Sequence, residues 1–280
     1  MIDNKSDDLK RLRNVEHEIL DLIVSICVKY NLKYSLAYGT LIGAVRHMGF
    51  IPWDDDIDIQ MPRDDYERFL QIWDELQPAG YILVNHRLNP DFTQNFSKIR
   101  KDHTIFLQTE KELNLNYHKG IFVDIFPVDR VAPKGVLRTT QYGMAAIHLL
   151  YTRGHASTPQ GGSLLERALL SLPKKYYPNL SLRTENFLRK WNARHNLLNV
   201  CFCTIGSAKI YYPADMFDSL IEMKFENKEY KCFKNYDQIL RADYGDYMKL
   251  PPIDERVYKH TTLMLDFEHN LDEIIAEGCE

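Results

Sequence analysis

Four aspartates stand within residues 54–58 of the sequence, namely Asp54, Asp55, Asp56 and Asp58. Carboxylates this close repel one another, and the interleaved Ile57 and Ile59 require a buried face where water is scarce. A divalent cation relieves this repulsion directly, and hard carboxylate oxygens select magnesium, or manganese, over zinc. The run therefore predicts a magnesium site for phosphate chemistry, and a solvated acidic loop is the alternative.

The order of residues within this run indicates which acids bind the metal. Acid and isoleucine alternate over residues 56–60, as in a β-strand, and alternate side chains of a strand point to the same face. Asp56 and Asp58 are therefore predicted as inner ligands on one face. Asp55 is expected to face away.

A further acid, Asp124, lies inside the apolar run of residues 120–127. A buried carboxylate without a partner is strongly disfavoured, so this position requires a cation. We expect Asp124 to complete the metal site and to help deprotonate an acceptor hydroxyl. A purely structural ion pair with a buried partner such as Arg100 is the alternative.

Three further features could hold a phosphate. Gly39 and Thr40 stand at a predicted strand-to-helix turn, where backbone N–H groups and a hydroxyl can bind anions, and the acidic run follows closely. Arg46 could reach the phosphate, or it could offset the dipole at a helix end. Lys98 and Arg100 alternate on a predicted strand, where they could meet the charge of a transferring phosphate or line a solvated face.

The elements that must position these residues follow from hydrophobic periodicity. Apolar residues recur every three or four positions over residues 8–30, which predicts an amphipathic helix. Further helices are expected through residue 46 and after Pro62. Short strands are expected at 33–38, 56–60, 81–84, 96–100, 104–107 and 120–125. These elements together predict a mixed α/β core.

The second half of the chain is predicted to be divided differently. Residues 133–198 read as a helical insertion between a catalytic core, 1–132, and a C-terminal part, 199–280, that completes the catalytic domain. Within the last part, a hairpin at 220–225 and 229–233 precedes a short helix at 237–243. The fold class is therefore α/β or α+β, with a mixed sheet, flanking helices and a helical insertion.

Composition excludes several functional classes. The chain has 280 residues, 45% hydrophobic and 26% charged, with a formal net charge of -4, which fits a compact globular protein without the broad basic surface of a nucleic-acid binder. Five cysteines without a C-x-x-C pair argue against a disulfide scaffold or zinc knuckle. The apolar run at 19–24 is too short to span a bilayer and no signal peptide precedes it, so a cytoplasmic location is expected, with peripheral contact at the membrane face as an option.

The motifs described above resemble those of the LicD family, which includes bacterial phosphocholine transferases and is related to the fukutin-type enzymes of glycan phosphorylation. The resemblance is carried by residues 38–47, which read YGTLIGAVRH, and by 51–58, which read IPWDDDID. Residues 124–129 and 244–247 and the pair Pro251-Pro252 are also similar, whereas the helical middle matches least.

The resemblance implies a nucleotidyltransferase-like fold, in which a Gly-Thr turn precedes an Asp-x-Asp strand and a later strand adds a third carboxylate. These roles fall on Gly39, Thr40, Asp56, Asp58 and Asp124. Asp54 also matches the acidic run of the family, which implies that it is a secondary or direct ligand of the metal. The resemblance also implies that magnesium bridges the diphosphate of CDP-choline or a related nucleotide-activated alcohol. The expected acceptor is a sugar hydroxyl of a cell-surface glycan (teichoic acid, lipopolysaccharide or capsule) or of a lipid-linked sugar, and CMP leaves.

Several alternatives remain open at the level of sequence. Trp53 could be an aromatic wall for a quaternary ammonium, or it could wedge its loop. The same acids would serve a nucleotidyltransferase that releases pyrophosphate. The cargo could also be phosphoethanolamine, ribitol phosphate or another sugar phosphate, and a non-catalytic binding protein is a further alternative.

Overall fold

The computed structural model describes residues 5–132, 135–156, 162–192, 198–201, 212–213, 215–258 and 262–277. Its centre is a mixed sheet in which the strands follow the order β1-β2-β6-β4-β3, while β7 pairs with β6 and β8 with β7. The strands are β1 (Ser35–Leu36), β2 (Asp58–Pro62), β3 (Tyr81–Val84), β4 (Ser97–Lys101), β6 (Phe122–Val131), β7 (Leu198–Cys201) and β8 (Tyr212–Pro213). The predicted mixed α/β class is confirmed.

The centre of the sheet combines both strand directions. β2 and β6 are parallel and place Asp58 opposite Asp124, whereas β4 runs antiparallel to β6 and places Lys98 opposite the same Asp124. The helix α3 (Arg63–Leu76) follows β2 directly and belongs to the crossover toward β6, as parallel strands require. Register thus aligns side chains from three strands that are far apart in sequence.

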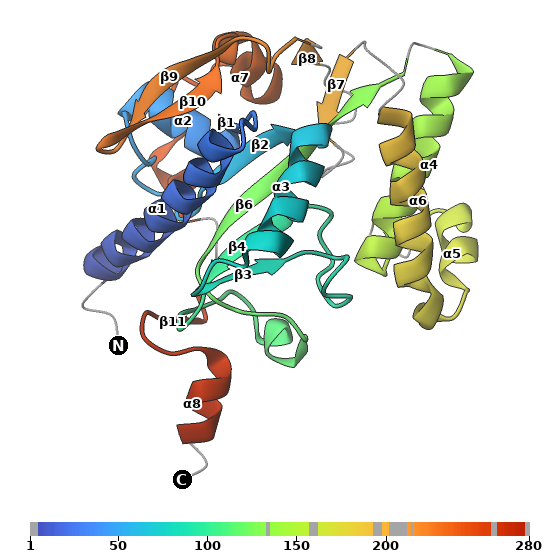
Figure 1. The fold of residues 1–280 in the computed structure, drawn as a ribbon, viewed down its shortest axis with the longest axis horizontal. Helices are drawn as coiled ribbons and strands as arrows, with labels where there is room; N and C mark the ends of the chain where they lie inside the picture. Colours follow the sequence, from blue (N-terminus) through green and yellow to red (C-terminus); the bar gives the residue numbers. More distant parts are fainter. Residues whose placement is uncertain are drawn as a thin grey trace.

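Two helices cover one face of the sheet (Figure 1). α1 (Lys5–Lys29) and α3 pack against β4, β6 and β2, and the Tyr66 hydroxyl of α3 lies 2.6 Å from that of Ser97 in β4. Fully buried side chains such as Ile59, Ile99 and Ile125 belong to the apolar core of this layer. The amphipathic helix expected at 8–30 and the helix expected after Pro62 are both confirmed.

The remaining elements of the core close around the edges of the sheet. The predicted hairpin is confirmed as β9 (Leu220–Phe225) with β10 (Lys228–Phe233), and the helix after it as α7 (Tyr236–Tyr244). α2 (Tyr38–His47) contacts both β9 and α7. The other elements are β5 (Ile105–Leu107), which pairs with β11 (Met264–Asp266), the 3-10 turns η1 (Glu110–Asn114), η2 (Lys174–Tyr176) and η4 (Ile253–Glu255), and the helix α8 (Leu271–Glu277).

Three helices lie together beside the sheet, at the right of Figure 1. They are α4 (Val136–Arg153), α5 (Leu164–Leu170) and α6 (Tyr177–Asn192), so the helical character expected of the middle segment is confirmed where the structure describes it. α4 and α6 pack on each other around Ala145 and Leu188, a small apolar cluster separate from the main core. Ser163 begins α5 with a capping box to Glu166.

Two of the strand boundaries that differ from the sequence prediction bear on the site. β2 begins at Asp58 rather than at residue 56, because its ladder with β6 begins at Asp58 and the preceding acids belong to a loop. β6 continues from Phe122 to Val131, beyond the expected end at 125, because its second half pairs with β7. Pro127, which has no N–H donor, lies within the ladder opposite Met61.

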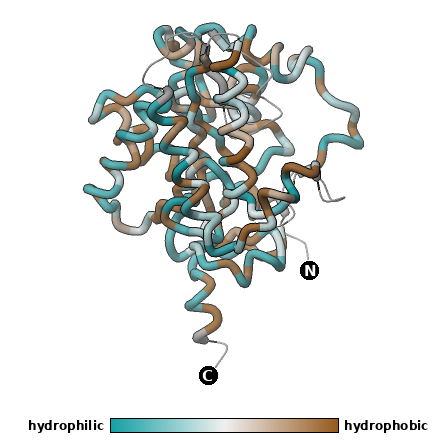
Figure 2. Tube along the Cα trace, turned by 90° about the vertical axis from the view of Figure 1, so that its right-hand side faces the viewer, coloured by the Kyte–Doolittle hydropathy of each residue, from teal (hydrophilic) through white to brown (hydrophobic). Residues whose placement is uncertain are grey.

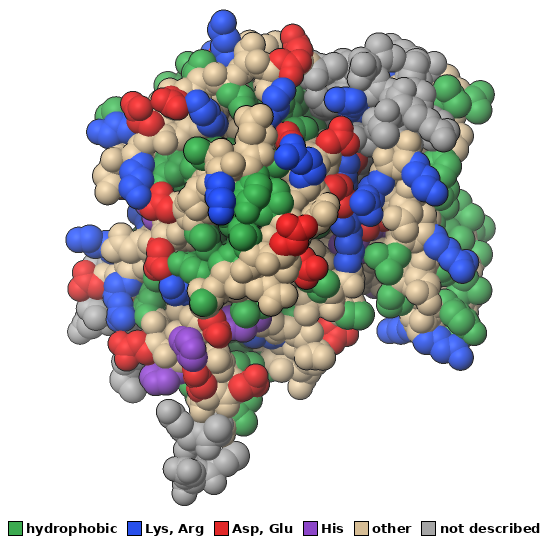
Figure 3. All heavy atoms as spheres, in the orientation of Figure 1, with side chains coloured by type: hydrophobic (Ala, Val, Ile, Leu, Met, Phe, Trp, Pro, Cys, Tyr) green, Lys and Arg blue, Asp and Glu red, His purple; other side chains and the backbone are tan. Residues whose placement is uncertain are grey.

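The described helices are amphipathic rather than uniformly apolar. Figure 2 shows hydrophilic and hydrophobic residues alternating along the helical turns of the chain. Among the described residues, none of the helices combines the length and the apolar character that crossing a bilayer requires. On the face that carries α1 and α3, positive and negative side chains are intermixed over the surface (Figure 3).

Candidate active site

Asp58, Asp124 and Lys98 form a row across three adjacent strands, β2, β6 and β4. Partners in strand register point to the same face of the sheet. This face is the one opposite α1 and α3, since Ser97, which contacts α3, precedes Lys98 in an alternating strand. The structure therefore brings together two of the predicted metal ligands and one of the predicted cations.

The partner of Asp124 within this row is Lys98. The Lys98 Nζ atom lies 2.7 Å from Oδ1 and 2.9 Å from Oδ2 of the carboxylate. Burial raises the pKa of Asp124 and the Lys98 charge opposes that rise, while burial lowers the pKa of Lys98 and the Asp124 charge opposes that fall. Each charge therefore stabilises the other in this buried position. Asp124 therefore has the buried ion-pair partner that the sequence offered as the alternative to a metal, but this partner is Lys98 rather than Arg100.

Arg100 has a separate position on β4. One of its guanidinium nitrogens donates to the Gly120 carbonyl at 2.6 Å, and its guanidinium carbon lies 4.9 Å from the ring centroid of Phe122. Burial lowers the pKa of Arg100 to about 10. Because Lys98 and Arg100 are 9% and 4% exposed, the alternative of a solvated strand face is wrong.

The acids that precede β2 gather in a second group. Asp54, Asp55 and Asp56 each offer a carboxylate oxygen within 4.8 Å of the others. Asp55 is only 3% exposed, so the expectation that it faces away is wrong, as is the alternative of a solvated loop. The prediction of its direction failed because these acids lie in a loop, where the two-residue alternation of a strand does not apply.

Arg13 of α1 binds the backbone of this loop, a role that sequence analysis missed. Its Nη2 atom donates to the carbonyls of Ile51 at 2.8 Å, Pro52 at 3.1 Å and Asp54 at 2.6 Å, and Nε donates to the Asp54 carbonyl at 3.1 Å. The guanidinium also lies over the ring of Phe50. One cation therefore satisfies successive carbonyls and fixes the path of the loop.

Gly39 and Thr40 lie in the first turn of α2, where backbone N–H groups have no intrahelical acceptor. A Cβ atom on Gly39 would lie 2.6 Å from Oδ2 of Asp54, so this carboxylate packs directly against the helix N-terminus, which favours negative charge. The Thr40 hydroxyl accepts a hydrogen bond from the backbone N–H of Asp58 at 2.8 Å. Both residues thus position the predicted ligands.

Glu16 of α1 is a buried acid that sequence analysis also missed. It has no exposed surface, and neither carboxylate oxygen has a hydrogen-bond partner. Burial raises the pKa of Glu16 well above its usual value, and the charges of Asp56 and Asp55 raise it further. An available signal was its place on the apolar stripe of the helix, between Leu12 and Ile19.

The donor set of this region fits a magnesium ion. Hard carboxylate oxygens converge in a buried loop, next to an orphaned buried carboxyl on Glu16, and such groups are costly unless a cation or proton compensates them. The converging group contains Asp56 but neither Asp58 nor Asp124. The charge of Asp56 nevertheless raises the pKa of Asp124, so the loop and the row belong to one electrostatic region.

Arg46 and Trp53 face the C-terminal segment. Arg46 donates to the Tyr247 carbonyl at 2.5 Å and to the His47 ring at 2.9 Å, and burial lowers its pKa while Asp54 opposes the fall. The Arg256 guanidinium lies 5.5 Å from the ring centroid of Trp53. Trp53 therefore already has a cationic neighbour from the chain itself.

Tyr244, at the end of α7, is a further neighbour of the acids. Burial raises the pKa of its hydroxyl, and the negative charge of Asp58 is the next largest cause. The hydroxyl thus remains protonated and able to donate. Sequence analysis included this residue in the resemblance but did not place it at the site.

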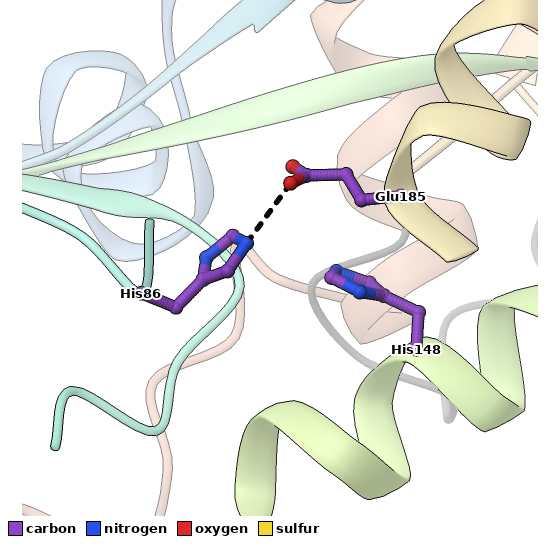
Figure 4. A group of neighbouring side chains, drawn as sticks. All are labelled: His86, His148 and Glu185. Atoms are coloured by element: carbon purple, nitrogen blue, oxygen red, sulfur yellow. Dashed lines mark hydrogen bonds and ion pairs between the residues drawn. The ribbon is translucent and has the colours of Figure 1, made fainter. Parts of the chain in front are cut away.

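A second group of metal-binding residue types lies between the sheet and the helices (Figure 4). His86 follows β3, His148 belongs to α4 and Glu185 to α6. The Glu185 carboxylate accepts from His86 Nε2 at 3.1 Å and from Arg87 at 2.7 and 3.0 Å. A cation would have to compete with this arginine, so we interpret the group as a structural link. Sequence spacing gave no signal, because Glu185 lies 98 residues from Arg87.

His148 is held as a neutral ring within this link. Its Nδ1 atom lies 3.2 Å from the Ser181 carbonyl and 3.1 Å from the Ser181 hydroxyl. Burial lowers the pKa of His148 to about 4. The ring therefore joins α4 to α6 without carrying charge at neutral pH.

Comparison with known proteins places this geometry in a family. A family described as LicD/FKTN/FKRP, nucleotidyltransferase domain, matches residues 31–145, the range that contains every residue predicted for the site. The lipopolysaccharide cholinephosphotransferase LicD of Haemophilus influenzae is 30% identical over 253 residues, 86% of this chain and 92% of that protein. An uncharacterized protein of Rickettsia typhi is 37% identical over 86 residues, which cover 31% of this chain and 26% of that protein. An uncharacterized protein of Rickettsia prowazekii is 31% identical over 136 residues, which cover 45% of this chain and 47% of that protein. The chain belongs to the LicD family.

Proposed function

We propose that this LicD-family phosphotransferase moves a phosphocholine-type group from a CDP-alcohol, such as CDP-choline, to a sugar hydroxyl of a cell-surface glycan and releases CMP. The observation that carries the proposal is the alignment of Asp58 and Asp124 beside the acidic loop. It occurs in a chain that is 30% identical to a protein named as a lipopolysaccharide cholinephosphotransferase.

Each acid has a distinct part in the proposed reaction. Asp56, Asp58 and Asp124, with Asp54, would hold magnesium, which when bound supplies positive charge to the diphosphate of the donor. The acceptor hydroxyl oxygen forms a bond to the terminal phosphorus as the bond from that phosphorus to the oxygen of CMP breaks. Asp124 accepts the hydroxyl proton, and burial, by raising its pKa, makes the carboxylate a stronger base.

The neighbouring residues orient these acids and the donor. Lys98 keeps Asp124 ionised and directed along the row, and Thr40 and Gly39 fix Asp58 and Asp54. The N-terminus of α2 offers N–H groups to a phosphate oxygen. Arg46 is a further cation at this end of the site.

The direct test is to offer the protein and magnesium a panel of nucleotide-activated alcohols and to measure the products. CMP from a CDP-alcohol supports the proposal, whereas pyrophosphate from a nucleoside triphosphate would establish the alternative nucleotidyltransferase activity. Asp56→Ala and Asp58→Ala should each lower turnover by about 100-fold or more, because each removes charge stabilisation from the transition state. Near-native turnover in either variant would contradict the metal assignment.

The control for these substitutions is Asp74→Ala, since Asp74 is exposed on α3, on the other face of the sheet. It should leave turnover unchanged. Circular dichroism and the unfolding midpoint of each variant check that the fold persists.

The acceptor is also part of the proposal. We infer that residues 133–198 form an insertion that contacts the glycan acceptor or the membrane surface, because the catalytic motifs lie elsewhere in the chain. Exchanging this segment for that of a relative should alter acceptor choice and leave CMP release from the donor unchanged.

A further inference from the structure

Three aromatic side chains form a cluster of their own outside the main core. Phe126 packs with the partly exposed rings of Tyr38 and Phe96. The ring centroids of Tyr38 and Phe126 are 5.1 Å apart with their planes at 83°, and those of Phe96 and Phe126 are 4.4 Å apart at 37°. Two nearly perpendicular rings and a third tilted ring thus make an aromatic corner.

This corner lies on the same face of the sheet as the row of charged residues. Phe126 follows Asp124 by two positions on β6, so alternation directs both side chains to one face. Phe96 lies immediately before β4, and its ring packs against that of Phe126. Residues two positions apart along a strand are about 7 Å apart, so their side chains are direct neighbours on the same face of the sheet. The aromatic corner therefore adjoins the place where the donor's terminal phosphate would lie.

The exposure of Tyr38 and Phe96 distinguishes these two rings from core side chains. Both are partly exposed, whereas Phe126, which they contact, is 9% exposed, as buried as Ile72 of the main core. An apolar surface that remains accessible beside buried charges is suited to a ligand rather than to the core.

Tyr38 adopts a backbone conformation that a bulky residue rarely accepts. Its φ angle is 47°, in the left-handed region, immediately before Gly39 at the start of α2. Such conformations cost of order 1–3 kcal/mol and tend to occur at functional sites, because the surrounding structure must hold them. This conformation directs the Tyr38 ring against Phe126.

We propose that Tyr38, Phe96 and Phe126 form the subsite for a quaternary ammonium group on the alcohol part of the donor, which makes the enzyme selective for choline. This inference rests on the proposed function. A trimethylammonium group is attracted to aromatic faces and needs no hydrogen-bond acceptor, whereas a primary ammonium is strongly hydrated and does need acceptors. Choline has only a two-carbon link between its nitrogen and its phosphate, so the subsite must adjoin the acids, as the corner does.

Two other rings near the site, those of Phe122 and Trp53, have a cation from the chain over them. Lys98 Nζ lies 3.2 Å from the centroid of Phe122, farther away, at 5.6 Å, from that of Phe96 in the corner, and its charge is paired with Asp124. Arg256 lies over Trp53. The ammonium subsite is therefore assigned to the corner rather than to Trp53, the aromatic wall that the sequence suggested.

The test is calorimetric binding of CDP-choline, CDP-ethanolamine and CMP in the presence of magnesium and without acceptor. The wild-type protein should bind CDP-choline about tenfold more tightly than CDP-ethanolamine. Phe96→Leu and Phe126→Leu should each remove most of this preference, while their affinity for CMP stays unchanged. Phe96→Tyr keeps an aromatic face and should keep the preference.

A matched control is Phe267→Leu, which alters a partly buried ring that packs on the main core and lies under Arg11. It should leave all three affinities unchanged. A preference for CDP-choline that survives both leucine variants, or its absence in the wild-type protein, would overturn the subsite. CMP release from CDP-ethanolamine with no preference for choline would overturn the subsite yet leave the proposed transfer standing, whereas failure to bind any CDP-alcohol would overturn both.

Discussion

Single residues around the candidate site determine where its acids lie. Gly39 leaves space for the Asp54 carboxylate, Arg13 fixes the carbonyls of the loop, and Thr40 accepts from the backbone of Asp58. Each contact is local and specific in geometry. The acids can therefore be displaced by substitutions that leave their own side chains intact.

Gly39→Ala tests this dependence on space. The added methyl group would lie 2.6 Å from Oδ2 of Asp54, so the carboxylate must move. We expect turnover to fall by about 100-fold, as small misplacements at active sites do. The free energy of unfolding should not fall in proportion, because alanine favours a helix over glycine by about 1 kcal/mol. Steady-state turnover and chemical denaturation measure the two effects.

The matched control for this variant is Gly143→Ala in α4. No atom lies within 4 Å of a Cβ atom at Gly143, so the same substitution meets no clash. It should stabilise the protein slightly and leave turnover unchanged. Equal turnover in the Gly39 and Gly143 variants would show that the packing of Asp54 against α2 does not matter.

Glu16→Gln tests the buried carboxyl beneath the loop. The pKa of Glu16 is raised in the folded protein, so its contribution to stability is full below the unfolded value of about 4.5 and is lost as pH rises through the folded value. In the presence of a chelator of divalent cations, the free energy of unfolding at pH 7 should therefore be larger for the variant than for the wild-type protein. The expected difference is about 1.4 kcal/mol for each unit of the pKa shift.

The same experiment at pH 4 is the internal control, because both side chains are then neutral and the difference should vanish. Urea denaturation at the two pH values measures it. A wild-type protein that is the more stable of the two at pH 7 without divalent cations would show that Glu16 has a favourable partner in the folded state.

At the scale of helices and strands, periodic segments were predictable and long-range pairings were not. The helices α1 and α3 and the hairpin of β9 and β10 follow from repeating apolar residues and a turn, which are local signals. The second half of β6 was missed because its pairing with β7 joins segments about 70 residues apart, which no local pattern indicates.

The candidate site was predictable to a similar extent. Residue type and spacing indicated the acids, whereas the strand register that places Asp58 beside Asp124 is known only from the structure. The Lys98 partner of Asp124 depends on a register between strands that no local pattern encodes. The direction of Asp55 was predicted wrongly because strand alternation was extended into a loop.

At the scale of the whole molecule, a buried ion-pair network joins the sheet to the helices beside it. Arg87 binds Glu67 of α3 and Glu185 of α6, at 2.6 and 2.7 Å, and Arg63 binds Asp129 of β6 at 2.6 Å and lies 3.7 Å from Glu185. The domain boundaries after residues 132 and 198 stay predictions. The network nevertheless shows how α6 is attached, through charges rather than through the main apolar core.

Glu185→Gln is expected to weaken that attachment. Ion pairs and hydrogen bonds from His86 and Arg87 lower the pKa of Glu185 despite burial, so the ionised form stabilises the folded state. Removing its charge leaves the buried arginines without part of their compensating negative charge, which should lower the free energy of unfolding by about 3 kcal/mol. Hydrogen exchange in α4 and α6 should accelerate more than exchange in β2 and β6, because the helices lose their link while the sheet keeps its ladder.

The control for this variant is Glu222→Gln, which removes one partner of an exposed pair with Lys231. Such pairs contribute little, so exchange rates should not change. Since Glu185 contacts none of the acids of the site, CMP release from the donor should persist in the folded fraction of the Glu185 variant. If exchange instead accelerated equally in the sheet and the helices, the helices would not be a separately opening unit, and the attachment through Glu185 would be part of one cooperative fold.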